Sequence, residues 1–235
     1  MSEPITLTQR VAHLCACAYS DAERVIRDGG ARVDGMIVRE PTQLITGEVV
    51  EVDPAAHPDA IEPATVLHHK PAGVNFAADA RIEPATRWSE DPSGVTMLPR
   101  HFKGLTALMP LDTDASGLVV LSQDGRVWRR LTEDSNEIEQ EFIVEVRGEA
   151  GPYALGMLAR GLSFNGRALP PCKVSWQNEV RLRFAIHDVQ PGQLQHMCAA
   201  VGFEIVAMRR IRIGRIPLSK LPPGQWRALP VGERF

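Results

Sequence analysis

The chain has 235 residues, of which 44% are hydrophobic, and a formal net charge of −3. This composition is typical of a globular protein and allows one large domain or two smaller ones. No segment approaches the roughly 18 consecutive apolar residues of a membrane helix, so we expect no membrane span. The N-terminus lacks a basic region followed by an apolar run, which predicts a cytoplasmic protein without a signal peptide. The charge excludes a strongly basic nucleic-acid binder but not a local basic patch.

The four cysteines show neither a metal-binding nor a disulfide pattern. Cys15 and Cys17 are two positions apart, Cys172 and Cys198 are isolated, and there is no Cys-x-x-Cys pair. We therefore expect small buried thiols in a reducing compartment, with no zinc site.

Residues 1–53 predict a small module that begins with two helices. Apolar residues recur at helical spacing over residues 8–16. Ser20, with Glu23 three residues later, matches a capping box and predicts the start of a second helix over residues 21–28. Gly29 follows and is a typical helix end.

The same module is expected to continue as a β-hairpin. Asp34-Gly35 lies between the β-prone runs 31–33 and 36–38, which is a strong hairpin signal. A further β-prone run at 49–52 closes the module. Residues 54–63, rich in Pro, Ala and Asp, predict a linker to a second domain over residues 64–235.

The second domain predicts an α+β fold with a mainly antiparallel mixed sheet, because strands are interrupted by single helices. Residues 66–74 predict a strand that ends at a Pro-x-Gly turn, and residues 141–148 and 180–186 alternate as half-buried strands do. Residues 126–131 and 193–201 predict helices. Residues 76–100 are weakly patterned and predict an irregular excursion.

An acidic turn followed by an apolar strand, Leu111-Asp112-Thr113-Asp114-Ala115-Ser116-Gly117-Leu118, is the most informative segment. It resembles the catalytic motif of the pseudouridine synthases of the RsuA/RluB/E/F family, Gly-Arg-Leu-Asp-x-x-Thr/Ser-x-Gly-Leu. The segment Lys70-Pro71-Ala72-Gly73-Val74 and the tail at 221–229 resemble other motifs of that family, in the same order. Residues 1–53 resemble its S4 RNA-binding domain. The resemblance thus covers nearly the whole chain.

The resemblance implies an enzyme that detaches uracil from its ribose, rotates it and rejoins it through carbon 5, without cofactor or metal. Asp112 would be the nucleophile or base, and Phe142 would stack on the base, while Gln195 and His196 would line the substrate pocket. Asp114 could share this role or simply form the turn. The implied partner is RNA, and ribosomal RNA or its precursor is the first candidate. Because the family is usually monomeric, we also expect a monomer.

Five basic residues are candidates for contacts with RNA phosphates. For Lys70 the alternative is an ordinary lysine at the end of a strand. For the four arginines of the N-terminal module the alternative is a solvated face without RNA. The five residues are Arg10, Arg24, Arg27, Arg32 and Lys70.

Three departures from the family pattern surround Asp112. Pro110 replaces an arginine, Phe142 replaces a tyrosine, and Gln195 replaces the arginine expected to pair with the catalytic aspartate. His196, Arg209 or Arg210 could compensate for the lost charge. These departures keep two alternatives open, an RNA-binding protein with the same fold but without turnover, and a protein-interaction module that does not bind RNA.

Overall fold

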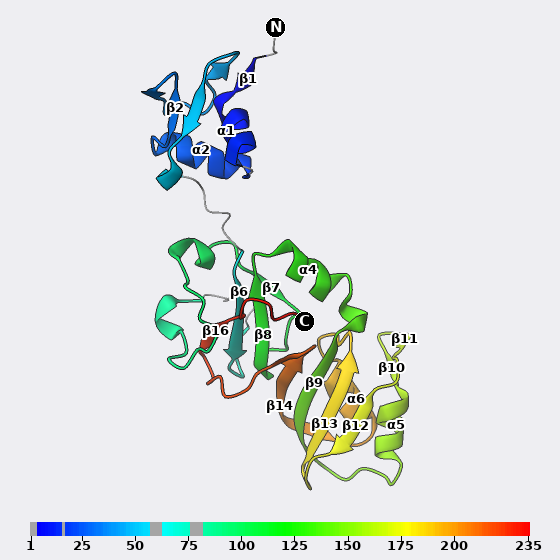
Figure 1. The fold of residues 1–235 in the computed structure, drawn as a ribbon. Coiled ribbons are helices and arrows are strands. Elements are labelled where there is room, and N and C mark those ends of the chain that lie inside the picture. Colours follow the sequence, from blue (N-terminus) through cyan, green and yellow to red (C-terminus); the bar gives the residue numbers. More distant parts are fainter. Residues whose placement is uncertain (1–3, 16, 57–62, 76–81) are drawn as a thin grey trace. The chain divides into compact units, whose positions relative to one another are not determined.

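The computed structural model describes residues 4–15, 17–56, 63–75 and 82–235. The chain divides into two compact units, Met1–Glu62 and Pro63–Phe235, and each is described by itself (Figure 1). Most of the expected linker, at residues 57–62, lies outside the described residues.

The N-terminal unit packs two helices against short antiparallel strands. Strand β2 pairs with both β3 and β5, and β1 pairs with β4. Leu7, Val11 and Ile26 are fully buried in its core. The elements are β1 (Ile5–Thr6), α1 (Leu7–Cys15), α2 (Tyr19–Arg27), β2 (Ala31–Val33), β3 (Met36–Ile37), β4 (Leu44–Ile45), β5 (Val50–Val52) and a 3-10 turn (Pro54–Ala56).

A capping box starts α1 rather than α2. The backbone N–H of Thr6 donates to Gln9 Oε1 at 2.9 Å, and the N–H of Gln9 donates to Thr6 Oγ1 at 3.2 Å. Helix α2 begins after Ala18, which makes no side-chain cap. Ser20 therefore lies inside the first turn, and the prediction that it caps the helix is wrong. Sequence spacing alone could not tell a cap from an interior serine.

The predicted hairpin is present. Asp34 and Gly35 both have positive φ, 48° and 82°, and join β2 to β3, as the tight hairpin turn requires. The side chain of Asp34 also accepts a hydrogen bond from the N–H of Val49 at 2.9 Å. The turn residue thereby ties the hairpin to the segment that enters β5.

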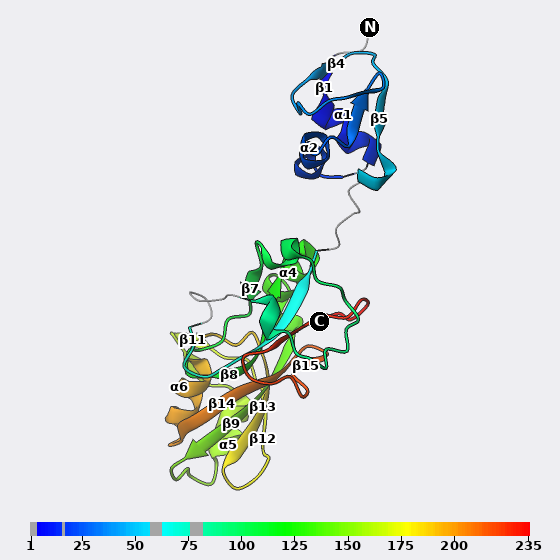
Figure 2. The same ribbon diagram turned by 90° about the vertical axis from the view of Figure 1, so that its left-hand side faces the viewer.

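The C-terminal unit is built on one nine-stranded mixed sheet, which confirms the predicted α+β class (Figures 1 and 2). Its main order is β12-β13-β9-β14-β8-β6-β16, with β7 added to β8 and β15 to β14. Among the described strands, β14 and β8 form the one parallel pair. The strands are β6 (Thr65–Lys70), β7 (Thr106–Leu108), β8 (Ser116–Ser122), β9 (Glu139–Arg147), β12 (Lys173–Trp176), β13 (Arg181–His187), β14 (Glu204–Ile213), β15 (Ile216–Pro217) and β16 (Trp226–Ala228).

Helices cover this sheet through apolar side chains. Leu158 of α5 (Ala154–Arg160) and Met197 of α6 (Gln193–Ala200) are fully buried against the face that carries Phe142 of β9. Leu131 of α4 (Gly125–Thr132) packs with β7 and β8. The remaining elements are the hairpin β10 (Ser163–Phe164) and β11 (Arg167–Ala168) and three 3-10 turns, Pro84–Thr86, Pro99–Phe102 and Ser135–Glu137. Within the described ranges, none of the helices is long and apolar enough to cross a membrane.

The close approach of β8 to β14 depends on Gly117. Its φ is 119°, which L side chains rarely adopt, and a Cβ atom at this position would collide with the backbone of Arg210. Glycine therefore lets the two strands meet at the end of β8 that follows the Asp112 turn. This packing fixes the turn against the centre of the sheet.

Candidate active site

The carboxylate of Asp112 lies at the N-terminal end of α6. The backbone N–H of Gly192 donates to Oδ1 at 3.1 Å and to Oδ2 at 3.3 Å. The side-chain amide of Gln195 donates to Oδ2 at 2.9 Å. Two elements far apart in the sequence, the turn before β8 and the start of α6, thus hold one carboxylate in a defined orientation. A helix N-terminus also favours a negative charge.

These hydrogen bonds come from neutral groups. Among the described residues, no lysine, arginine or histidine forms an ion pair or hydrogen bond with the Asp112 carboxylate. Gln195, at the sequence position where the resemblance implies an arginine, donates to the aspartate but carries no charge. Asp114 is exposed and lies outside this contact.

A small cavity of about 10 Å³ adjoins Asp112. Phe142 is buried and lines this cavity. This space holds about one water molecule and is too small for a nucleobase. The full lining is Pro110, Leu111, Asp112, Phe142, Val189, Gln190, Pro191, Leu194, Met208 and Arg210.

Arg210 also lines this cavity. From the sequence alone it is one of three residues that could compensate for the missing charge. Its guanidinium is buried and donates to the carbonyls of Met109 and Leu118, both at 2.8 Å, and to Gln140 Oε1 at 2.9 Å. It also lies 5.9 Å from the centre of the Phe142 ring.

Burial lowers the pKa of Arg210, and the negative charge of Asp112 opposes that shift. A guanidinium stays protonated in proteins, so a buried positive charge faces the cavity that Asp112 lines. The alternation of side chains along β14 could have distinguished Arg210 from Arg209 in the sequence. It places Arg210 on the inward face with Met208 and leaves Arg209 exposed.

His196 does not compensate for the missing charge. Its Nε2 atom lies 2.8 Å from the carbonyl oxygen of Ser163, and its ring is tilted against Phe164 with the centroids 5.4 Å apart. The side chain is exposed and is not among the residues that line the Asp112 cavity. That His196 lines the substrate pocket stays a prediction, and in this structure its neighbour Gln195 makes the contact with Asp112.

Lys70 holds the Asp112 turn from inside the protein. It is fully buried, and its Nζ donates to the carbonyls of Pro71, Thr113 and Ala115 at 3.0, 2.8 and 2.6 Å. Burial lowers the pKa of Lys70, and the charges of Asp114 and Asp112 oppose that shift. All three donors of the ammonium are used within the fold, so the prediction of an RNA phosphate contact is wrong.

In the N-terminal unit, three of the four arginines expected to hold RNA already have protein partners. Arg24 pairs with Asp21 and Arg27 pairs with Glu23, each at 3.0 Å. Arg32 donates weakly to the carbonyl of Gly35 at 3.4 Å. Arg10 has no hydrogen bond or ion pair with another described residue.

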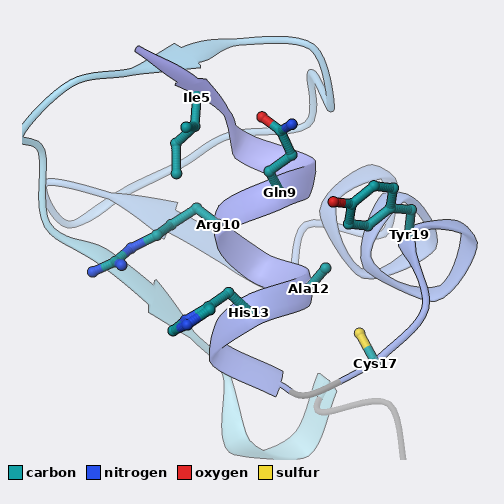
Figure 3. A pocket seen from close by; sticks show the side chains of 7 residues that line it. All are labelled: Ile5, Gln9, Arg10, Ala12, His13, Cys17 and Tyr19. Atoms are coloured by element: carbon teal, nitrogen blue, oxygen red, sulfur yellow. The ribbon is translucent and has the colours of Figure 1, made fainter. Parts of the chain in front are cut away.

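Arg10 lines an open hollow of about 480 Å³ on the N-terminal unit. Figure 3 shows Arg10 and His13 extending from α1 to one side, with Gln9 and the largely exposed Tyr19 on the other. Ile5, Ala12 and Cys17 complete the lining. The hollow thus combines a free cation with an exposed aromatic ring.

The described residues contain no cluster of His, Cys, Asp or Glu that could hold a metal ion.

No family model matches the chain. The chain is 23% identical over 97% of its length to dual-specificity RNA pseudouridine synthase RluF of Salmonella typhi, covering 76% of that protein. It is 27% identical to ribosomal large subunit pseudouridine synthase B of Bacillus subtilis, and 26% identical to ribosomal small subunit pseudouridine synthase A of Salmonella typhimurium. Both matches cover 97% of this chain, and 93% and 97% of the relatives.

These similarities, each over 97% of this chain, support its assignment to the pseudouridine synthases. A crystal structure of a pseudouridylate synthase shares the fold, with a TM-score of 0.59, 22% identity and 96% coverage of both chains. Within this family, the chain differs from the expected pattern at Pro110, Phe142 and Gln195. In this chain Phe142 is buried at the cavity, and Gln195 donates a hydrogen bond to the aspartate.

Proposed function

We propose that this protein is an RNA pseudouridine synthase that isomerises a uridine in structured RNA, with Asp112 as nucleophile or base. The bond between N1 and C1′ breaks, the uracil turns, and a bond between C5 and C1′ forms. The proton lost from C5 is balanced by the proton that N1 gains, so the reaction needs no oxidant, reductant or cofactor. Ribosomal RNA is the first candidate substrate, because the names of the relatives refer to it.

The orientation of Asp112 carries the proposal. Gly192 and Gln195 hold both carboxylate oxygens at 2.9–3.3 Å, and Lys70 fixes the backbone of the turn. A carboxylate held in this way is prepared to attack C1′ or to remove a proton from the ribose. Arg210 adds a buried positive charge to the same cavity.

Phe142 is the proposed stacking partner of the uracil. A cavity of about 10 Å³ cannot receive a base, so binding requires the side chains that line it to move apart. The target uridine must also leave its stack in the RNA, as in other enzymes that act on a base.

We further propose that residues 1–53 form an S4-like RNA-binding domain, joined by a linker at 54–63 to a catalytic domain at 64–235. Arg10 is the most favourable phosphate contact, because Arg24 and Arg27 are already paired with carboxylates. Tyr19, across α1 from Arg10 in the same hollow, offers a surface on which a base could stack. Residues 1–53 contain five arginines and nine aspartates and glutamates, so we expect phosphate contacts to be few. We also propose that the protein acts in the cytoplasm, as a monomer.

Pseudouridine mapping tests the proposal. Ribosomal RNA from a deletion strain is compared with RNA from the same strain complemented by the wild type, Asp112→Asn or Asp114→Asn. We expect one or a few sites to lose pseudouridine on deletion and to regain it with the wild type and with Asp114→Asn. Asp112→Asn should restore none.

One alternative function is favoured by a specific observation. Each hydrogen bond to Asp112 between described residues comes from a neutral donor, as expected if catalysis has been lost and RNA binding kept. In that case the deletion would leave the pseudouridine content of ribosomal, transfer and messenger RNA unchanged, while the purified protein would still bind RNA. That result would refute the enzyme proposal.

A further inference from the structure

The side-chain amide of Gln195 has one partnered end and one unpartnered end. Its Nε2 donates to Asp112 Oδ2 at 2.9 Å. A carboxylate accepts hydrogen bonds, so this contact fixes which end of the amide faces Asp112. The other end, Oε1, is shielded from solvent and has no hydrogen-bond partner among the described residues. Such an unpartnered buried acceptor is unfavourable and calls for a donor.

We infer that Gln195 Oε1 accepts a hydrogen bond from the ribose 2′-hydroxyl of the bound uridine and so favours ribose over deoxyribose. This inference rests on the proposed function. It depends on a residue that replaces the arginine of the family pattern, because arginine has only donors and could not accept this bond.

The chemistry of a uridine within RNA narrows the choice of donor. The 3′ and 5′ oxygens are esterified, so the nucleoside offers two donors, the 2′-hydroxyl and the imide N3–H. Asp112 acts at C1′ or at the neighbouring C2′ in the proposed reaction, and the 2′-hydroxyl is bonded to C2′. The N3–H lies on the part of the ring directed away from the ribose. The donor close to the Asp112 carboxylate is therefore the 2′-hydroxyl.

The proposed bond also suits the order of the reaction. The uracil must turn between bond cleavage and bond formation, whereas the ribose stays attached to the RNA. Gln195 binds Asp112 through Nε2. A contact from Oε1 to the 2′-hydroxyl would therefore keep C1′ of the ribose next to the Asp112 carboxylate while the base turns. Gln195 would thus position the sugar and the carboxylate with a single amide.

The test uses the full chain and synthetic RNA fragments that contain the mapped target site. The target position carries uridine, 2′-deoxyuridine or N3-methyluridine. The dissociation constant of each RNA and its rate of pseudouridine formation are measured with the wild type and with Gln195→Met, which keeps length but removes donor and acceptor. Gln177→Met, on an exposed turn after β12, is the matched control.

We expect the wild type and Gln177→Met to prefer uridine over 2′-deoxyuridine by about tenfold, the effect of one hydrogen bond. In Gln195→Met this ratio should fall to about one, whereas discrimination against N3-methyluridine should persist. An unchanged 2′-deoxyuridine ratio in Gln195→Met would overturn the inference. So would selective loss of the N3-methyl discrimination, which would identify N3–H as the donor.

Failure of the proposed function gives a different result. If the wild type forms no pseudouridine in any RNA, that function is wrong. The fragments are then taken from an RNA that the purified protein binds, with uridine or 2′-deoxyuridine at the bound position. Equal ratios of their dissociation constants in the wild type and Gln195→Met overturn the inference in that case too.

Discussion

The amide nitrogen of Gln195 lies 2.9 Å from Oδ2 of Asp112, at the position where the family pattern has an arginine. The contact between helix α6 and the aspartate is therefore kept although its charge is lost. A positive charge is instead present on Arg210, which is buried in the sheet and lines the same cavity. Orientation and charge come from two residues here, whereas a single arginine could supply both.

Gln195→Arg should strengthen the hold on Asp112. A charge-assisted hydrogen bond is stronger than a neutral one by about 1 kcal/mol, so we expect the rate at saturating RNA to rise by up to about fivefold. Single-turnover measurements of pseudouridine formation check this. Gln177→Arg adds the same charge on an exposed turn and should not raise that rate. Equal rates for the wild type and Gln195→Arg would show that the neutral contact already suffices.

Lys70→Met should destabilise the protein. The substitution leaves three carbonyls around the Asp112 turn without their donor, at a cost of about 3 kcal/mol or more. Urea unfolding at pH 7 measures the loss. Lys103→Met, at an exposed position, should change the free energy of unfolding by less than about 0.5 kcal/mol. A small effect of Lys70→Met would mean that water replaces the ammonium.

The free energy of unfolding should fall as the pH drops from about 6.5 towards 4. Burial lowers the pKa of His68 to about 4, and burial also lowers that of His69. In this window the unfolded chain binds a proton at His68 that the folded chain does not bind. The free energy of unfolding is therefore highest above the pKa of His68 in the unfolded chain and decreases as the pH falls below it. The full effect for His68 is about 3 kcal/mol.

Unfolding by urea at a series of pH values between 4.5 and 7.5 checks this dependence. His68→Leu removes one titrating group and should flatten the slope over that range. An identical slope in the wild type and His68→Leu would contradict the assignment to His68. Carboxylates such as Glu48, whose pKa is lowered to about 2 by hydrogen bonds from the backbone N–H groups of Gly47 and Thr46, add to the loss only below about pH 5, so the comparison with His68→Leu isolates the histidine.

Arg10→Gln should weaken RNA binding more than Arg24→Gln does. Arg10 has no protein partner among the described residues, whereas Arg24 is already paired with Asp21 at 3.0 Å. Losing one phosphate contact should reduce the slope of log affinity against log salt by about one. Filter binding of ribosomal RNA fragments between 50 and 200 mM salt measures the slope. Equal effects of both substitutions would argue against a specific role for the hollow on α1.

The element pattern was largely readable from the sequence because it depends on local chemistry. Asp34-Gly35 predicted a hairpin turn that the structure confirms, and the alternation around Phe142 predicted the buried face of β9. Ser20 shows the limit of such reasoning. Its Ser-x-x-Glu spacing fits a capping box, but packing starts α2 one residue before Ser20, and the real box is Thr6 with Gln9.

The sequence by itself determined several of the helices and strands, the family resemblance and the nomination of Asp112, because each depends on residue types at short, fixed spacings. Tertiary structure alone decided what surrounds that carboxylate. Gly192 and Gln195 reach Asp112 across about 80 residues of chain, Lys70 turns inward to the carbonyls of the turn, and Arg210 enters the core from β14. Such contacts depend on how β8 packs beside β14 and α6, and no local pattern specifies that arrangement.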